Sequence, residues 1–314
     1  MYVILDGFTL GTGILLPLIQ NYHERNIVMS AVLPTWDGNQ TWLVLGGAAL
    51  YGAFPLAFST LLPILYLPLM IMVLALLFRG VVFEFRLKSK KGRRNWDRLY
   101  STSSIITAFI QGVVFGAFVQ GFDIQITHET YHYVWLTPFT ISTGIALVFG
   151  YALLGATRLL IKTEGVLNDR ICFISRILTI VISLFIVLFS FWTPHIDAFA
   201  VNKWFDPTVR NYLIIFPIIC LLAFLGFWCA SLKKHDVWPY WCVIAMFLSC
   251  YIGFGITTWP YIVPHAITIW QAAAPLSTLA FILPGAIIMI PILLFYTGYS
   301  YHIFRGKIKD VIKY

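Results

Sequence analysis

The stretch Pro34-Thr35-Trp36-Asp37-Gly38-Asn39-Gln40-Thr41-Trp42 places an acid, two amides and two indoles directly before an apolar run. Asp37, followed three residues later by Gln40, matches the capping box that begins many helices, so a helix is expected over about 41–59. In a membrane protein such a polar cluster either caps a helix or belongs to a route for protons or a ligand. The fold class depends on whether apolar runs such as the one after Trp42 recur along the rest of the chain.

The composition is that of a membrane protein. Of the 314 residues, 60% are hydrophobic and only 11% are charged, and the mean hydropathy is +0.84. A soluble domain of this size would lack the charged surface that keeps it in solution. Runs of about 20 apolar residues recur and alternating strands do not, which favours helices over a barrel. The predicted fold class is an all-α integral membrane protein.

The apolar runs predict about nine transmembrane helices in a single polytopic membrane domain covering residues 1–314. The first run is barely long enough to span a bilayer, so it is expected to be a shortened helix. Pro63 and Pro68 predict a tight turn and a kinked start for the third helix. The expected spans lie near 1–20, 41–59, 61–84, 102–121, 134–160, 171–192, 209–231, 237–262 and 277–303.

Basic residues predict the orientation. With nine spans, all but two of the 21 Lys and Arg residues fall on one side of the membrane, and Lys203 and Arg210 are the exceptions. The positive-inside rule then places the basic loops and the C-terminus in the cytoplasm. The charged run 86–98 is expected to be a solvated loop that contacts anionic membrane lipids. A nucleic-acid partner is not expected, because the run has no stacking aromatic residues.

Three carboxylates are candidates for proton transfer. Asp6 lies in an apolar segment, where a carboxylate is costly unless it is paired, hydrated or protonated; the alternative places it in the outer headgroup region. Asp37 is either a helix cap or a cytoplasmic proton uptake point. Glu84 lies between Arg79 and Arg86, which predicts a partly paired set at the cytoplasmic interface. The alternatives for Glu84 are contact with a partner subunit and a place in a proton path.

No metal or haem site is predicted in this chain. The five cysteines form no CxxC motif, and they lie within or at the edges of apolar runs, where packing is the expected role. His128 and His132 are spaced as on one helix face, but no third ligand follows at a suitable spacing. The spacings Gly7/Gly11 and Gly112/Gly116 predict close contact between helices.

The chain resembles subunit II of the cytochrome bd-type quinol oxidases, including the cyanide-insensitive branch. The matching stretches run through nearly the whole sequence in order. They are Leu5-Asp6-Gly7-Phe8 with Gly11 and Gly13, Pro34 to Leu43, Arg79-Gly80-Val81-Val82-Phe83-Glu84-Phe85-Arg86, Pro260-Tyr261-Ile262-Val263-Pro264, Thr268-Ile269-Trp270-Gln271-Ala272-Ala273-Ala274-Pro275, Tyr296-Thr297-Gly298-Tyr299, and Phe304-Arg305-Gly306-Lys307.

The resemblance implies a respiratory complex in the bacterial inner membrane that oxidises quinol and reduces oxygen to water. A haem-bearing subunit I would be the partner and would hold haems b and d. A small accessory subunit and a bound quinone are further possibilities. The acidic residues of subunit II would line a hydrophilic proton path, with Asp37 and Asp6 as the carried-over positions and Glu84 added from its chemistry. Trp36, Asn39 and Gln40 would support Asp37.

Two positions depart from the resemblance. Thr9 and Gln271 stand where the family usually carries acids, which predicts an altered proton route. The sequence also leaves two other functions open. One is a proton-coupled secondary transporter with Asp6 and Asp37 as coupling sites, although no inverted repeat is visible. The other is a purely structural assembly subunit.

Overall fold

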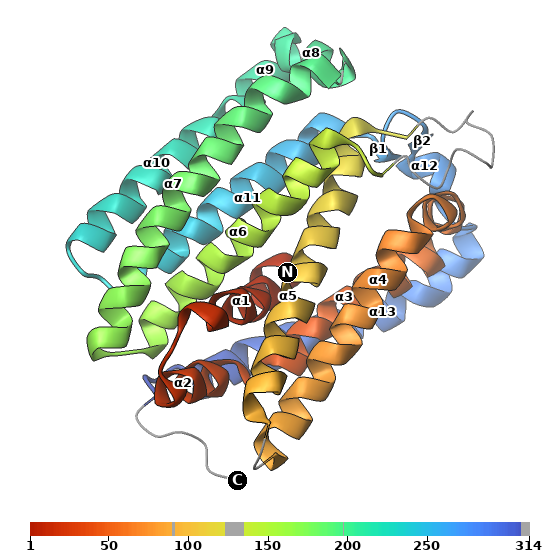
Figure 1. The fold of residues 1–314 in the computed structure, drawn as a ribbon. Coiled ribbons are helices and arrows are strands. Elements are labelled where there is room, and N and C mark those ends of the chain that lie inside the picture. The colour runs from red at the N-terminus through yellow and green to blue at the C-terminus, as the bar shows by residue number, and fades with distance from the viewer. Residues whose placement is uncertain (90–91, 123–134, 197, 309–314) are drawn as a thin grey trace.

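A computed structural model describes residues 1–89, 92–122, 135–196 and 198–308, and Figure 1 shows their fold. These residues are helical apart from turns and a two-stranded antiparallel sheet. The elements are α1 (Tyr2–Leu15), η1 (Leu16–Leu18), α2 (Tyr22–Val32), α3 (Trp36–Ala53), α4 (Pro55–Lys88), α5 (Arg93–Gln120), α6 (Pro138–Lys162), α7 (Gly165–Ile196), α8 (Ala198–Phe205), α9 (Pro207–Leu213), α10 (Ile215–Leu232), α11 (Trp238–Thr258), β1 (Tyr261–Val263), β2 (Ile267–Thr268), α12 (Ile269–Ala272) and α13 (Leu276–Ile303).

Seven helical stretches of the described chain are long and apolar enough to cross a membrane. They are α4, α5, α6, α7, α9 together with α10, α11 and α13. The stretch formed by α1 and η1, Tyr2–Leu18, is apolar but shorter. Helix α3 has 18 residues and a polar first turn. The all-α integral membrane class is therefore confirmed, and the count of nine spans stays a prediction.

Helix α3 begins earlier than the sequence predicted. Its N-cap is Thr35, no side chain caps it, and Asp37 lies in its first turn. The expected capping box between Asp37 and Gln40 is therefore wrong, because the helix already starts at Trp36. A carboxylate in a first turn still interacts favourably with the helix dipole. The capping boxes of the described chain lie elsewhere, at Thr137/Thr140 and Thr268/Gln271.

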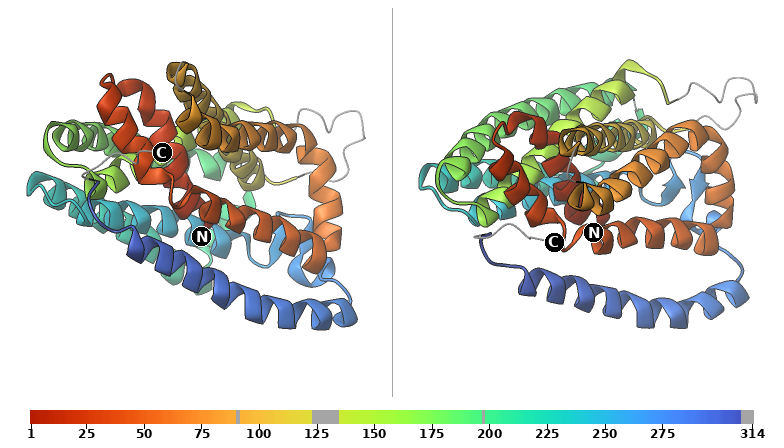
Figure 2. Two further views of the ribbon diagram at one scale, coloured as in Figure 1. Left: turned by 90° about the horizontal axis from the view of Figure 1, so that it is seen from below. Right: turned by 60° about the horizontal axis from the view of Figure 1, so that its bottom comes forward.

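The break between α3 and α4 also differs from the prediction. Helix α3 ends at Ala53, and α4 begins at Pro55 rather than near residue 61. Proline is well suited to the first position of a helix because its missing N–H would have no partner there. Pro63 and Pro68 lie inside α4. Figure 2 shows that α4 bends in its N-terminal part, as expected for internal prolines.

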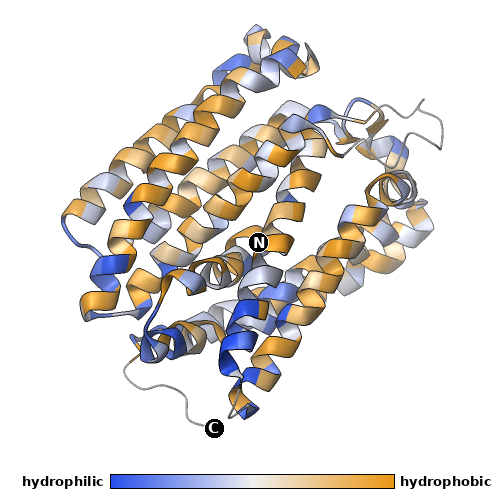
Figure 3. Cartoon of the chain, viewed as in Figure 1, coloured by the Kyte–Doolittle hydropathy of each residue, from blue (hydrophilic) through white to orange (hydrophobic). Residues whose placement is uncertain are grey.

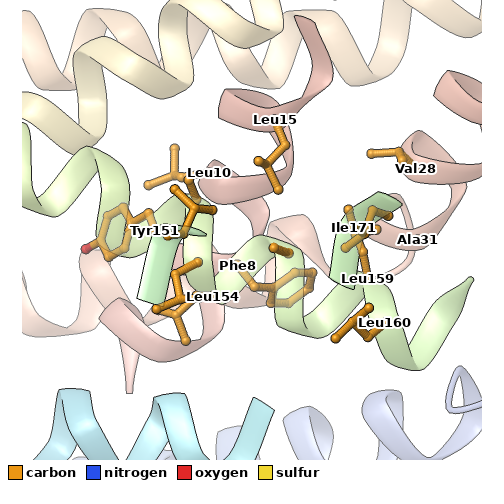
Figure 4. Close-up of a cluster of buried hydrophobic side chains, with 14 of the residues drawn as sticks. Phe8, Leu10, Leu15, Val28, Ala31, Tyr151, Leu154, Leu159, Leu160 and Ile171 are labelled. Atoms are coloured by element: carbon orange, nitrogen blue, oxygen red, sulfur yellow. The ribbon is translucent and has the colours of Figure 1, made fainter. Parts of the chain in front are cut away.

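Helix α1 is packed in the interior of the bundle against α6. A Cβ atom on Gly11 would lie 1.8 Å from the backbone oxygen of Tyr151, and one on Gly155 would lie 2.5 Å from the carbonyl carbon of Gly11. A Cβ on Gly112 of α5 would lie 2.5 Å from the backbone oxygen of Thr143. The close helix packing predicted from the glycine spacings is confirmed. Figure 4 shows buried side chains of α1 and α6 meeting around this crossing.

Hydrophilic residues gather at one end of the bundle. Figure 3 shows them at α2, the C-terminal end of α4 and the N-terminal end of α5, while the helices are mainly hydrophobic along their lengths. Helix α13 lies along one side of the bundle (Figure 2), and Thr297 is its one buried residue. The molecule therefore has a charged end, a tightly packed interior around α1, and a large apolar surface.

Candidate functional site

A fully buried ion pair joins α1 to α4. Nη1 of Arg79 donates to both carboxylate oxygens of Asp6 at 2.9 Å, and neither side chain has any exposed surface. Asp6 therefore lies in the helix core and not in the headgroup region. Isolated charges at such a position would be strongly unfavourable, and mutual pairing with further hydrogen bonds is what makes them tolerable.

Polar side chains from three other helices surround the pair. Nη2 of Arg79 donates to Oε1 of Gln40 on α3 at 3.1 Å. The hydroxyl of Tyr2 interacts with Asp6 and accepts a hydrogen bond from Nε2 of Gln111 on α5 at 2.7 Å. The hydroxyl of Tyr151 on α6 donates to Oε1 of Gln111 at 2.7 Å. We call Asp6, Arg79, Gln40, Tyr2 and Gln111 the core cluster.

The predicted supporting residues of the opening stretch lie in and beside this cluster. Nδ2 of the buried Asn39 donates to the backbone oxygen of Leu5 at 2.9 Å and to Oγ1 of Thr9 at 3.2 Å. Oδ1 of Asn39 accepts the hydroxyl of Tyr301 at 3.1 Å. Thr9, at a position expected to carry an acid, is thus a partner of Asn39. The ring of Trp36 stacks on a neighbouring aromatic ring of α4 at a centroid distance of 4.9 Å.

The other two candidate carboxylates lie outside the core cluster. Asp37 is exposed on α3. Glu84 is exposed and forms a surface ion pair with Lys88 at 3.7 Å. The expected set of Glu84 with Arg79 and Arg86 is wrong, because residues two or five positions away lie on different faces of a helix with 3.6 residues per turn. Both arginines turn inward instead.

A second ionic cluster lies at the charged end of the bundle, and the sequence did not reveal it. Nε of Arg86 donates to Oδ1 of Asp97 at 2.5 Å, and Nη1 of Arg25 lies 3.3 Å from Oδ2. Arg86 also donates to Oδ1 of Asn26 at 3.0 Å. We call Arg25, Asn26, Arg86 and Asp97 the end cluster. The prediction that 86–98 is simply a solvated loop is wrong for Arg86 and Asp97, which are both buried.

One sequence signal could have revealed the end cluster. Asp97 is the single acid within the basic run 86–98, and it falls in the first two turns of α5. An acid among so many bases is a natural partner for a buried arginine. Its partners could not be deduced, because Arg25 is more than 70 residues away in the chain and is brought near by α2.

Gln271, the other departure from the expected acidic pattern, has a local structural role. Its Oε1 accepts the backbone N–H of Thr268 at 2.8 Å, and its own N–H donates to Oγ1 of Thr268 at 3.4 Å. This capping box begins α12. Gln271 therefore caps the N-terminus of a short helix outside the core cluster.

The described residues contain no group of three His, Cys, Asp or Glu side chains that could hold a metal ion. His128 and His132 lie outside the described residues. All five cysteines are free thiols. What the core cluster offers chemically is a carboxylate in a polar network enclosed by helices, which is an arrangement typical of proton or ion handling in membrane proteins.

Comparisons with known proteins identify the family of the chain. A family model described as cytochrome bd terminal oxidase subunit II matches residues 1–304. The chain is 28% identical over 346 residues to cytochrome bd-I ubiquinol oxidase subunit 2 of Escherichia coli strain K12, covering 98% of this chain and 91% of that protein. It is 26% identical over 325 residues to cytochrome bd ubiquinol oxidase subunit 2 of Bacillus subtilis strain 168, covering 98% and 92%.

A solved structure shares the fold. The bd oxidase from Geobacillus thermodenitrificans includes a chain that matches 97% of this one with a TM-score of 0.79 and 16% identity, and the match covers 93% of that chain. The matched family and the relatives are oxidase subunits, so the secondary-transporter alternative is not supported. With a family model that extends over nearly the whole sequence, the chain belongs to the family of cytochrome bd terminal oxidase subunit II.

Proposed function

We propose that this chain works in a bacterial plasma membrane beside a haem-bearing subunit I, which oxidises quinol and reduces oxygen to water. The named relatives are subunits 2 of ubiquinol oxidases, which supports quinol as the reductant. Haems b and d belong to the partner in this proposal, and this chain carries none. The positive-inside rule, applied to the basic loops, supports a cytoplasmic C-terminus. A bound quinone and a small accessory subunit remain predictions.

We further propose that this subunit handles protons at Asp6. The observation that carries the proposal is the fully buried pair of Asp6 and Arg79 within the core cluster. A buried ion pair is weak support for a purely stabilising role, since well-packed apolar residues would often hold helices together as well. An ionisable residue kept inside a membrane bundle is by default a functional one.

Asp37 and Glu84 take a different place in the proposal. Both carboxylates are exposed, Asp37 in the first turn of α3 and Glu84 near the C-terminal end of α4, and their chain neighbours Trp36 and Phe83 stack on each other. An exposed carboxylate can collect protons from water or face a partner subunit. We therefore keep Asp37 as a proton uptake candidate. Glu84 is the weaker candidate, because Lys88 already pairs with it.

The test replaces the charged pair as a unit in the complete, co-expressed oxidase. Asp6→Asn alone would leave Arg79 buried and unpaired, so the informative variant is the double replacement Asp6→Asn with Arg79→Gln, which keeps hydrogen-bonding groups without charge. Quinol-dependent oxygen uptake is expected to fall at least about tenfold while the haem content stays at the wild-type level, since a lost proton-transfer group typically costs this much or more.

The exposed carboxylate of Asp37 serves as the comparison. Asp37→Asn, measured in the same way, tests proton uptake at the surface without touching a buried charge. Full turnover of the double variant at full haem content would reject proton handling at Asp6. Full turnover of Asp37→Asn would remove Asp37 from the path and leave Asp6 in it.

A further inference from the structure

An arginine near the C-terminal end of α6 has no anionic partner in the described part of the chain. Arg158 lies about one turn before Lys162, the last residue of α6. Its Nε is buried without a hydrogen-bond partner, and its guanidinium forms no ion pair or hydrogen bond with any described residue. By contrast, the buried Arg79 and Arg86 each hold a carboxylate. The counter-charge that a cation in a helix bundle requires must therefore reach Arg158 from elsewhere.

Three aromatic rings from three other helices lie against this guanidinium. Its central carbon is 5.6, 5.3 and 4.9 Å from the ring centroids of Phe8 on α1, Tyr240 on α11 and Tyr301 on α13. Such rings attract the cation, but they are poor acceptors for the five N–H donors of an arginine. Arg158 is only half-buried, so a ligand can approach its free donors from outside the bundle.

Lys162 adds a second cation on the same side of α6, since residues four positions apart are neighbours on a helix. Nζ of Lys162 donates to the backbone oxygens of Phe304 and Gly306, just after α13. These carbonyl groups hold the ammonium in place but carry no net charge. The adjacent Lys307, in contrast, pairs with Asp236 at 2.7 Å. Two neighbouring cations without a carboxylate form a site that favours an anion.

The residues beside Arg158 indicate that it lies at the level of the lipid headgroups. Its contact Tyr240 is flanked in the first turn of α11 by Trp238 and Trp241, and both tryptophans are exposed. Tryptophan concentrates where the headgroups meet the hydrocarbon core of a membrane. Exposed apolar side chains continue from this level along α11 and α13, among them Leu248, Ile252, Ile288, Ile292 and Phe295.

We propose that Arg158 and Lys162 bind the phosphate of an anionic membrane phospholipid between α6, α11 and α13. The planar guanidinium matches two phosphate oxygens, and charge-assisted hydrogen bonds of this kind are strong. Basic sites between transmembrane helices commonly take phospholipid headgroups. Free phosphate offers the same oxygens, but only a lipid also uses the apolar surface of α11 and α13. This site does not depend on proton handling at Asp6.

The phospholipid retained by the complete purified oxidase tests the proposal. The informative variant is Arg158→Gln with Lys162→Gln, which removes both charges and leaves no buried charge without a partner. After exhaustive washing in detergent, native mass spectrometry is expected to show one phospholipid fewer in the double variant than in the wild type. The same number of retained phospholipids in both complexes would overturn the site.

Arg176→Gln is the matched control. Arg176 on α7 is also half-buried, but its Nε and Nη2 donate to the hydroxyl and the backbone oxygen of Ser231 at 2.8 and 2.7 Å. Because these donors are occupied within the chain, Arg176→Gln should retain as many phospholipids as the wild type. Loss of the same lipid from this variant would show that general positive charge, and not Arg158 with Lys162, holds it.

Thermal unfolding of the washed wild-type complex distinguishes the sources of phosphate. Phosphatidylglycerol is expected to raise the unfolding midpoint, because a ligand that binds the folded state stabilises it. Phosphatidylcholine with the same acyl chains should act more weakly, since its choline adds a third cation. The half-maximal concentration of phosphatidylglycerol should be at least about tenfold higher in the double variant. An equal effect of inorganic phosphate on the wild type would overturn the assignment to a lipid.

A carboxylate of subunit I is the competing partner for Arg158. In that case the double variant would lose subunit I during purification, and phosphatidylglycerol would leave the unfolding midpoint of the wild type unchanged. That pair of results would overturn the lipid site. An intact complex of both subunits that lacks one phospholipid would support it. If the double variant yields no complex, the response of the wild type to phosphatidylglycerol and to inorganic phosphate decides between the two partners.

Discussion

Arg79→Gln is expected to destabilise the subunit by about 3–5 kcal/mol, because it leaves the carboxylate of Asp6 buried without its counter-charge. Gln40 loses its donor in the same variant. A loss of this size is a large share of the stability of a typical domain, so the yield of intact oxidase should fall sharply. The measurement is the amount of haem-loaded complex recovered from membranes and the midpoint of its thermal unfolding.

The double replacement Asp6→Asn with Arg79→Gln should recover most of this loss, since neither charge remains. Lys88→Gln is the surface control: it breaks the exposed pair with Glu84 and should change stability by no more than about 0.5 kcal/mol. Equal yields for Arg79→Gln and Lys88→Gln would contradict the buried pair.

Gly11→Ala is expected to disrupt the crossing of α1 and α6, at a cost on the order of 3 kcal/mol or more. The added methyl carbon would lie 1.8 Å from the backbone oxygen of Tyr151, and a backbone atom cannot turn away as a side chain can. The helices would have to separate. The displacement would also disturb the core cluster, because Asp6 and Tyr2 lie on the same helix. Thermal unfolding of the purified complex measures the effect.

Gly255→Ala provides the comparison, since a Cβ at Gly255 of α11 meets no atom within 4 Å. Alanine there should be neutral or slightly stabilising, because alanine favours a helix more than glycine does. A Gly11→Ala complex as stable as the Gly255→Ala complex would show that α1 and α6 are not in backbone contact.

Much of the architecture follows from local properties of the sequence. Apolar runs of bilayer length predict helices whatever their neighbours are, and the structure has them. The spacing of Gly7 and Gly11 predicts a close contact for the same local reason. Local properties do not fix the helix limits, as the early starts of α3 and α4 show. Thr35 is the N-cap residue of α3 and Pro55 is the first residue of α4, so Asp37 and the internal prolines did not mark the boundaries.

The sequence singled out Asp6 and Gln40 of the core cluster, but it did not single out Tyr2 or Gln111 and did not show how these residues connect. Asp6 is conspicuous as a carboxylate in an apolar run, and Asn39 and Gln40 as amides beside one. Their partner Arg79 looked like an interfacial residue beside Glu84, because a one-dimensional pattern does not show which way a helix faces. Asp97 was hidden in a basic run for the same reason.

The sequence by itself determined a helical membrane protein of the cytochrome bd subunit II type, since hydropathy, charge asymmetry and short motifs are properties of neighbouring residues. Only the tertiary structure decided that Asp6 pairs with Arg79 and that Asp97 pairs with Arg86 and Arg25. These contacts join residues 11 to 73 positions apart. They form because buried charges must find partners wherever the packing of the helices places them.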